Sequence, residues 1–151
     1  MVGLPCSGKT TKAKELEKEL SALRLTPDDW HVTLFGHDVH DPDHDKRHGL
    51  IEDMLWEIAL RTLSLGTNII LDFGFWAKEE REYFRSEAKK IGARSEIVFM
   101  DVDKEELLKR VRIRNKNLTN KIHYIPEDMM MGWIDFFQKP DTDELRPREN
   151  D

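Results

Sequence analysis

Apolar and polar residues follow one another along the chain with two distinct periods. Apolar side chains three and four residues apart predict amphipathic helices. The predicted segments are 9–23, 48–65, 78–91, 104–115 and a stretch that opens at 126. A further helix start is predicted at Thr26, because a Thr cap, a proline and two acids follow one another there. Between 36 and 48 the chain is a polar loop rich in His and Asp.

Two short apolar runs between the helical segments have the pattern of buried strands. Residues 68–73 and 96–101 each contain an unbroken apolar stretch, which is followed by Asp72 in the first run and by Asp101 in the second. Such runs are typical of strands covered on both faces in a parallel sheet. The sequence therefore predicts an α/β fold with a central parallel sheet flanked by helices. It predicts one domain over 1–151, with a polar, proline-bearing and loosely ordered tail over 138–151.

The start of the chain fits the phosphate-loop pattern G-x-x-x-x-G-K-[ST] without a gap, from Gly3 to Thr10. Glycines let the backbone N–H groups wrap a phosphate, and the following helix adds its positive end. Lys9 is expected to bridge the β- and γ-phosphates of ATP, and the Thr10 hydroxyl to bind Mg²⁺. The alternative is a chance glycine turn, but the amphipathic helix that follows at once favours the motif. The residues expected to contact the nucleotide here are Gly3, Pro5, Cys6, Ser7, Gly8, Lys9, Thr10 and Thr11.

Composition narrows the class of partner. Charged residues make up 36% of the chain and the net charge is −6, which argues against generic binding to nucleic acid. No apolar run approaches membrane-spanning length, and the single cysteine cannot form an internal disulfide. These features predict a protein of the reducing cytoplasm without a membrane anchor.

The polar loop invites a metal hypothesis. His37, His40, His44 and His48 alternate there with four aspartates, and His44 and His48 are four apart. That spacing allows both imidazoles to share one metal if the next helix begins early enough. The alternatives are a solvated loop and a loop that holds the second substrate.

Four segments in a fixed order resemble one group of enzymes. The phosphate loop is followed by T-P-D-D-W, I-I-L-D-F-G-F-W and L-L-K-R-V-R-I-R-N. Over 1–117 this order resembles the small P-loop kinases that include chloramphenicol phosphotransferase, zeta-toxin kinases and the kinase domain of phage polynucleotide kinase. The resemblance implies phosphorylation of a hydroxyl by ATP with Mg²⁺. It does not identify the acceptor, which in this group ranges from antibiotics to sugar nucleotides to nucleic-acid 5′ ends.

The resemblance also implies roles for residues outside the loop. Asp28 matches the carboxylate that takes the acceptor's proton, although Thr26 and Asp29 also fit a structural capping box. Asp72, at the end of a buried run, is expected to hold a Mg²⁺ water or to orient the substrate, the alternative being a strand-terminal cap for the following turn. Arg114 and Arg110 share a helix face and are expected to close over the phosphates, the alternative being a solvated basic face. Arg112 points elsewhere, and Arg81 and Arg85 are expected at the surface.

Two departures from that group shape the remaining expectations. Only two residues precede Gly3, so we expect further apolar residues before Met1, and no strand is evident after the last helix. The function expected is transfer of the γ-phosphoryl group of ATP to a small-molecule hydroxyl. The alternatives are a nucleic-acid 5′-hydroxyl kinase and a non-catalytic nucleotide-binding regulator.

Overall fold

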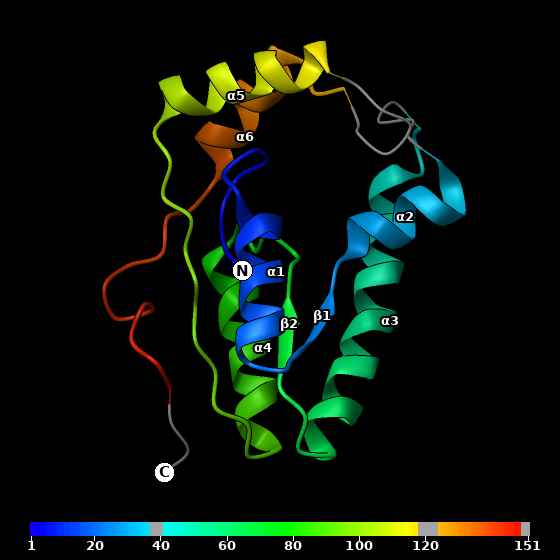
Figure 1. Cartoon of the computed structure of the whole chain (residues 1–151), viewed down its shortest axis with the longest axis vertical. Coiled ribbons are helices and arrows are strands. Elements are labelled where there is room, and N and C mark those ends of the chain that lie inside the picture. Colours follow the sequence, from blue (N-terminus) through cyan, green and yellow to red (C-terminus); the bar gives the residue numbers. More distant parts are fainter. Residues whose placement is uncertain (37–40, 118–123, 149–151) are drawn as a thin grey trace.

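Helices alternate with short strands in the computed structural model, which describes residues 1–36, 41–117 and 124–148. Among the described residues, no helix is both long and apolar enough to cross a membrane. The elements in chain order (Figure 1) are α1 (Lys9–Glu19), β1 (Leu23–Leu25), α2 (Pro27–Phe35), α3 (His44–Ser64), β2 (Ile69–Leu71), α4 (Lys78–Lys90), α5 (Lys104–Lys116) and α6 (Glu127–Phe136).

The sheet is parallel, as predicted, but its regular part is small. β1 and β2 pair with Arg24 opposite Ile70. Beyond β2 the pairing continues through Val2, which forms parallel bridges to Gly74 on one side and to Phe99 on the other. The predicted strand 96–101 is therefore wrong as a regular strand, since it pairs only around Phe99. Four segments nevertheless lie in the order β1, β2, Val2 and 98–100.

Two predicted element boundaries are also wrong. The helix predicted over 9–23 ends at Glu19, and β1 begins only four residues later. Leu23 and Leu25 match a strand as well as a helix stripe, and the left-handed backbone of Ser21 (φ 48°) turns the chain between the two elements. The polar loop expected to reach 48 ends earlier, because α3 already begins at His44.

Helices cover both faces of the sheet. Ile70 points to one face, where it packs in a cluster with Ala13 of α1 and Met1. Its neighbours Ile69 and Leu71 point to the other face and pack against a cluster from β1, α3 and α4. The buried residues of this cluster are Leu25, Ile51, Leu55, Trp56, Ala59 and Ala88. This alternation along β2 is the two-residue period of a strand. The result is a helix–sheet–helix layering.

A third apolar cluster joins α5 and α6 to the phosphate loop. Leu4 of the loop packs with Leu107 and Val111 of α5 and with Met130 of α6. In Figure 1, α5 and α6 lie together across the end of the molecule from which the loop emerges. Because Leu4 is fixed against α5, the loop and the arginines of that helix are held in one unit.

The segment after α6 is tied to α4 by buried arginines. The side chain of Arg81 is 1% exposed and forms a forked pair with Glu144, with Nε–Oε1 at 2.7 Å and Nη2–Oε2 at 3.2 Å. Arg85, also buried, donates to the Arg146 carbonyl oxygen and to the Ser95 hydroxyl. The expectation that both arginines lie at the surface is wrong, because Glu144 and backbone carbonyls compensate them in the interior. Residues 141–148, expected to be loosely ordered, supply these contacts.

We expect Glu144→Gln to lower the free energy of unfolding by about 3 kcal/mol, because the change leaves the Arg81 charge buried without a counter-ion. Asp143→Asn is the matched control, since the Asp143 side chain is 85% exposed and pairs only with an exposed Arg146 among the residues described. It should shift stability by less than about 0.5 kcal/mol. Urea unfolding of the two variants measures both values. Equal stabilities would show that the buried pair does not hold the segment.

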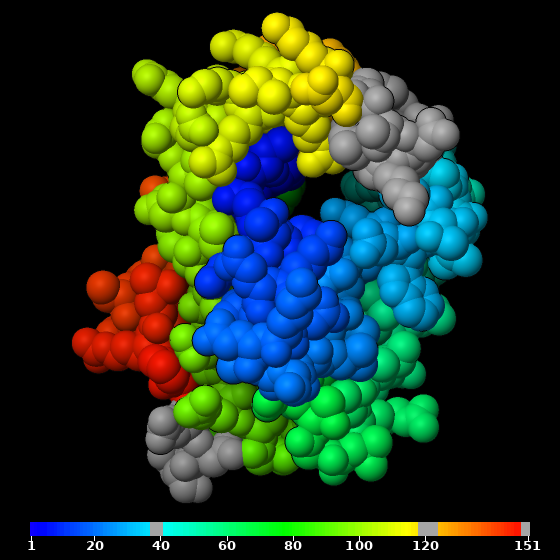
Figure 2. Space-filling model, viewed as in Figure 1, coloured from blue at the N-terminus to red at the C-terminus, as the bar shows by residue number. Residues whose placement is uncertain are grey.

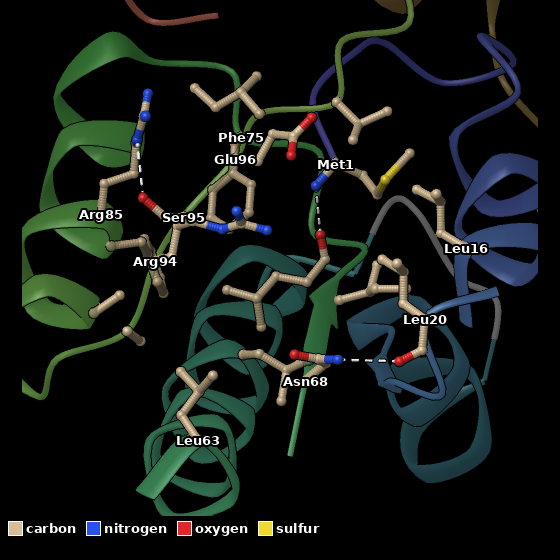
Figure 3. Close-up of a pocket in the computed structure, with 18 of the residues that line it drawn as sticks. Met1, Leu16, Leu20, Leu63, Asn68, Phe75, Arg85, Arg94, Ser95 and Glu96 are labelled. Carbon is tan, nitrogen blue, oxygen red and sulfur yellow. Dashed lines mark hydrogen bonds between the residues drawn. The ribbon is translucent and has the colours of Figure 1, made fainter. Parts of the chain in front are cut away.

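A cavity of about 450 Å³ lies at the amino ends of the strands. Figure 3 shows Leu16 of α1 and Leu20, which follows that helix, on one side of the cavity and Arg85 of α4 on another. The Asn68 amide donates to the Leu20 carbonyl oxygen. Asn68 precedes β2 and so marks the sheet edge opposite the phosphate loop. This cavity is therefore separate from the nucleotide site that the sequence predicts.

Candidate functional site

The phosphate loop has the backbone geometry that its glycines predict. Gly3 and Gly8 adopt positive φ angles of 147° and 95°, and Cys6 adopts 63°. A Cβ atom on Gly3 would lie 2.8 Å from Ser7 Oγ and 3.2 Å from the Met100 carbonyl oxygen. No side chain fits there, so the loop can fold this tightly only with glycine at that position. Gly8 then caps α1, which begins at Lys9.

Lys9 lies at the centre of the loop. Its ammonium group donates to the Leu4 carbonyl oxygen at 2.9 Å, so the side chain folds back over the loop. Burial lowers the pKa of Lys9, although the negative charges of Asp72 and Asp28 counteract the shift. Arg114 adds to the lowering. The charges of both candidate acids and of one candidate arginine therefore act on a single ammonium group.

Asp72 follows β2 and is buried beside the loop. Its side chain is 1% exposed, and Arg24 Nη1 of β1 lies 3.8 Å from its Oδ2. Burial raises the pKa of Asp72, although Thr10, Lys9 and Arg24 oppose that rise. The Thr10 hydroxyl is near enough to act on this pKa, but neither carboxylate oxygen has a partner in hydrogen-bond geometry among the described residues. A buried carboxylate of this kind, beside a threonine hydroxyl, fits the oxygen ligands that Mg²⁺ prefers.

Asp28 stands in the first turn of α2 and is exposed. The capping box considered for Thr26 and Asp29 is not formed, because Thr26 makes no side-chain cap. The Thr26 hydroxyl instead accepts from Arg24, and Asp29 lies 3.9 Å from the same guanidinium. The geometry thus gives Asp29 a structural partner and leaves Asp28 toward the loop, where its charge acts on Lys9.

Two of the three candidate arginines on α5 reach the phosphate loop. Arg110 Nη1 donates to the Cys6 carbonyl oxygen at 3.4 Å, and Arg114 Nη1 lies 3.9 Å from Cys6 Sγ. Arg114 Nε is buried without a hydrogen-bond partner among the described residues. Arg112 points away, as expected, and pairs with Glu127 of α6. Arg110 and Arg114 therefore both lie against the loop in which the motif would hold phosphates.

The space between these residues is open to solvent. Figure 2 shows the surface hollowed between the phosphate loop in dark blue, α5 in yellow and α2 in light blue. Pro5 is half-buried in the loop, whereas Thr10 and Thr11 are exposed on the first turn of α1. All the predicted site residues lie on the loop, the first turn of α1, the start of α2, the end of β2 or α5. The fold brings these segments to one end of the sheet.

Sequence reasoning missed Arg24, which contacts Asp72, Asp29 and Thr26 at once. A single arginine between two leucines, directly before a Thr-Pro-Asp-Asp segment, was the available signal. Phe73 and Phe75, which follow Asp72 in the chain, pack on Phe84. His37 and His40 of the polar loop lie outside the described residues.

Comparison with known proteins agrees with this geometry. A protein-family model described as an AAA domain matches residues 1–140. Among solved structures, a chain of the Pnkp1/Rnl/Hen1 RNA repair complex matches with a TM-score of 0.78 at 23% sequence identity. The match covers 99% of this chain and 47% of that chain, so the present chain spans less than half of its length. At this identity the likeness shows the fold, which is that of an α/β P-loop protein. Among curated proteins, none matches this chain significantly.

Proposed function

Because the chain belongs to the AAA domain family of small P-loop kinases, we propose that it transfers the γ-phosphoryl group of ATP to a hydroxyl of a small molecule. The observation that carries the proposal is the convergence on Lys9. The charges of Asp72, Asp28 and Arg114 all act on the pKa of that one ammonium group, although the residues come from separate segments. A phosphoryl-transfer site needs this combination of an acid near the acceptor and cations around the phosphates.

Each residue has a defined part in the proposed reaction. The loop N–H groups and Lys9 hold the β- and γ-phosphates, and Lys9 leaves the Leu4 carbonyl to do so. The oxygen of the acceptor hydroxyl bonds to the γ-phosphorus, and Asp28 accepts the proton that this hydroxyl loses. The bond from that phosphorus to the β–γ bridging oxygen breaks, and ADP leaves with the electron pair. Arg114 and Arg110 offset the negative charge that develops during transfer.

Thr10 and Asp72 are the residues that would hold Mg²⁺, Thr10 through its hydroxyl and Asp72 directly or through water. When bound, the ion would offset the negative charge of the phosphates during transfer. A nearby cation would also favour the ionised form of Asp72, whose pKa is otherwise raised by burial. The Asp72 carboxylate and the Thr10 hydroxyl are thus suited to the ion without rearrangement of the sheet.

Charge near Asp28 favours a small acceptor over nucleic acid. Asp28 and Asp29 open α2, and Asp41, Asp43 and Asp45 surround the start of α3, which packs on α2. Arg47 offsets part of this charge through ion pairs with Asp41 and Asp43. A phosphate backbone would meet net negative charge on this side. A 5′-hydroxyl kinase remains the second candidate, because the solved structure of similar fold belongs to an RNA repair complex.

A labelled-ATP acceptor screen tests the proposal. The protein with Mg²⁺ and γ-labelled ATP is offered hydroxyl-bearing small molecules in one arm and 5′-hydroxyl oligonucleotides in the other. Label on a small molecule supports the proposal, and label only on oligonucleotides establishes the second candidate. If ATP binds but label moves to no acceptor in either arm, the chain is a nucleotide-binding regulator.

The lone cysteine offers an independent test of where the nucleotide binds. Cys6 is half-buried in the loop and contacts Arg110 and Arg114 of α5. Saturating Mg·ATP should slow its alkylation by iodoacetamide by about tenfold or more, because the phosphates and the ordered loop block access. Mass spectrometry of timed samples measures the rate. Equal rates with and without nucleotide would place ATP elsewhere, and Mg·AMP, which lacks β- and γ-phosphates, is the control that should protect least.

A further inference from the structure

Three histidines from two helices meet near the start of α2, where Asp28 is proposed to act on the acceptor hydroxyl. We call the surroundings of Asp28 the acceptor region. His31 lies on α2, and His44 and His48 lie one turn apart on α3. One nitrogen from each of the three falls within 4.8 Å of the others. The ring centroids of His31 are 4.3 Å from His44 and 5.6 Å from His48. Sequence spacing pairs His44 with His48, but only the packing of α2 on α3 adds His31.

The three rings are partly or fully buried. His31 is 3% exposed, and His44 and His48 are half-buried. The Nδ1 atom of His44 is buried and has no hydrogen-bond partner among the described residues. A buried nitrogen with a lone pair and no donor is costly unless another group binds it. A bound group that accepts a lone pair, such as a metal ion, would satisfy this nitrogen.

The spacing suits a transition-metal ion. Three imidazole nitrogens bound to one ion at about 2.0–2.1 Å lie roughly 3.4 Å apart in a tetrahedral arrangement. The nitrogens now lie within 4.8 Å of one another, and small rotations of the rings would bring them to the separation that an ion requires. Imidazole favours Zn²⁺ and similar ions, whereas Mg²⁺ prefers oxygen. The three histidines therefore differ in ion preference from Thr10 and Asp72.

Neighbouring charges support a cation at this position. Glu52, one turn beyond His48 on α3, has its Oε1 3.5 Å from His48 Nε2. A carboxylate beside a ligating imidazole orients the ring and raises its basicity. Arg47 lies next to His48 in the chain, but Asp41 and Asp43 pair with it and offset its charge.

We propose that His31, His44 and His48 form a binding site for a divalent transition-metal ion of the Zn²⁺ class. Three nitrogen ligands leave a fourth position for water or for an oxygen of a bound molecule. The site lies near the start of α2, where Asp28 stands, and its charge would counter the acidic surroundings of the acceptor region. The metal site does not depend on the proposed kinase function, and it is tested without an activity assay.

Titration of the metal-free chain of residues 1–151 with Co²⁺ tests the site, because four-coordinate Co²⁺ gives strong visible absorption bands. Wild-type protein should bind one equivalent with these bands, and Zn²⁺ should displace it. His44→Gln and His48→Gln should each weaken Co²⁺ binding by at least about a hundredfold, and Glu52→Gln by about ten- to a hundredfold. Glu57→Gln, the same change as at Glu52 but at an exposed residue of α3 outside the cluster, should leave binding unchanged.

The buried His31 needs a separate control for folding. Circular dichroism and thermal melting of His31→Gln show whether the variant is folded, and the half-buried His48 supplies the decisive variant if it is not. In wild-type protein, saturating Zn²⁺ should raise the melting temperature, and this rise should vanish in His48→Gln. Absence of Co²⁺ bands in wild-type protein would overturn the proposal. So would Co²⁺ affinity that persists when all three histidines are replaced.

Discussion

Replacing Lys9 with alanine should lower kcat/KM for phosphoryl transfer by about a thousandfold, with loss in both ATP affinity and turnover. Lys9 is the ammonium group on which Asp28, Asp72 and Arg114 converge, and its pKa is already lowered by burial. Its charge contacts phosphates in the bound state and offsets the charge that develops during transfer. Removing it affects both steps, whereas a purely structural lysine would affect neither.

The control for Lys9→Ala is Lys12→Ala on the same helix. The Lys12 side chain is 40% exposed and pairs with Glu15. Its removal should leave ATP affinity and turnover within about twofold of wild type, as expected for a surface ion pair. Thermal melting checks folding, and alanine favours the helix at both positions. ATP affinity of Lys9→Ala equal to that of Lys12→Ala would exclude the loop as the nucleotide site.

Asp28→Asn should reduce turnover by about a hundredfold to ten-thousandfold while ATP affinity stays nearly unchanged. Asparagine keeps the size and polarity of the side chain but cannot accept the acceptor's proton. It is also as good as aspartate at a helix start, so a structural role alone forecasts almost no change in rate. Steady-state kinetics and calorimetric ATP titration of the variant separate the two explanations.

Asp29→Asn is the matched control, one residue along the same helix turn. Asp29 is exposed and lies 3.9 Å from Arg24, so the change should leave turnover within about threefold. If Asp28→Asn and Asp29→Asn lose turnover equally, the loss reflects the charge of the helix start. If Asp28→Asn turns over normally, the base is another group.

The parts of the fold that the sequence predicted are those determined by local rules. The loop from Gly3 to Thr10 is confirmed, because positive φ angles at Gly3 and Gly8 depend on residues within the motif. The helix through Leu55 and Ala59 was predicted by a long stripe of apolar residues. β1 was missed because three residues are too few to show a period, and its strand state follows from pairing with β2.

Side chains whose surroundings come from distant segments were not predictable. Arg81 was expected at the surface, but Glu144, sixty-three residues away, compensates its charge in the interior. Arg24 and His31 gain their partners only when β1 pairs with β2 and α2 packs on α3. Asp28 and Arg114 were proposed from a resemblance. The structure brings both near Lys9, and their roles stay predictions.

The central claim is that the γ-phosphoryl group of bound ATP passes to a hydroxyl of a small molecule. The most direct measurement is the stoichiometry of transfer, with ADP and phosphorylated acceptor counted in the same reaction, with and without acceptor. We expect slow ADP formation without acceptor, faster formation with the acceptor, and one phosphorylated acceptor for each additional ADP. ADP formation that no small-molecule acceptor accelerates, with all phosphate released to water, would contradict it.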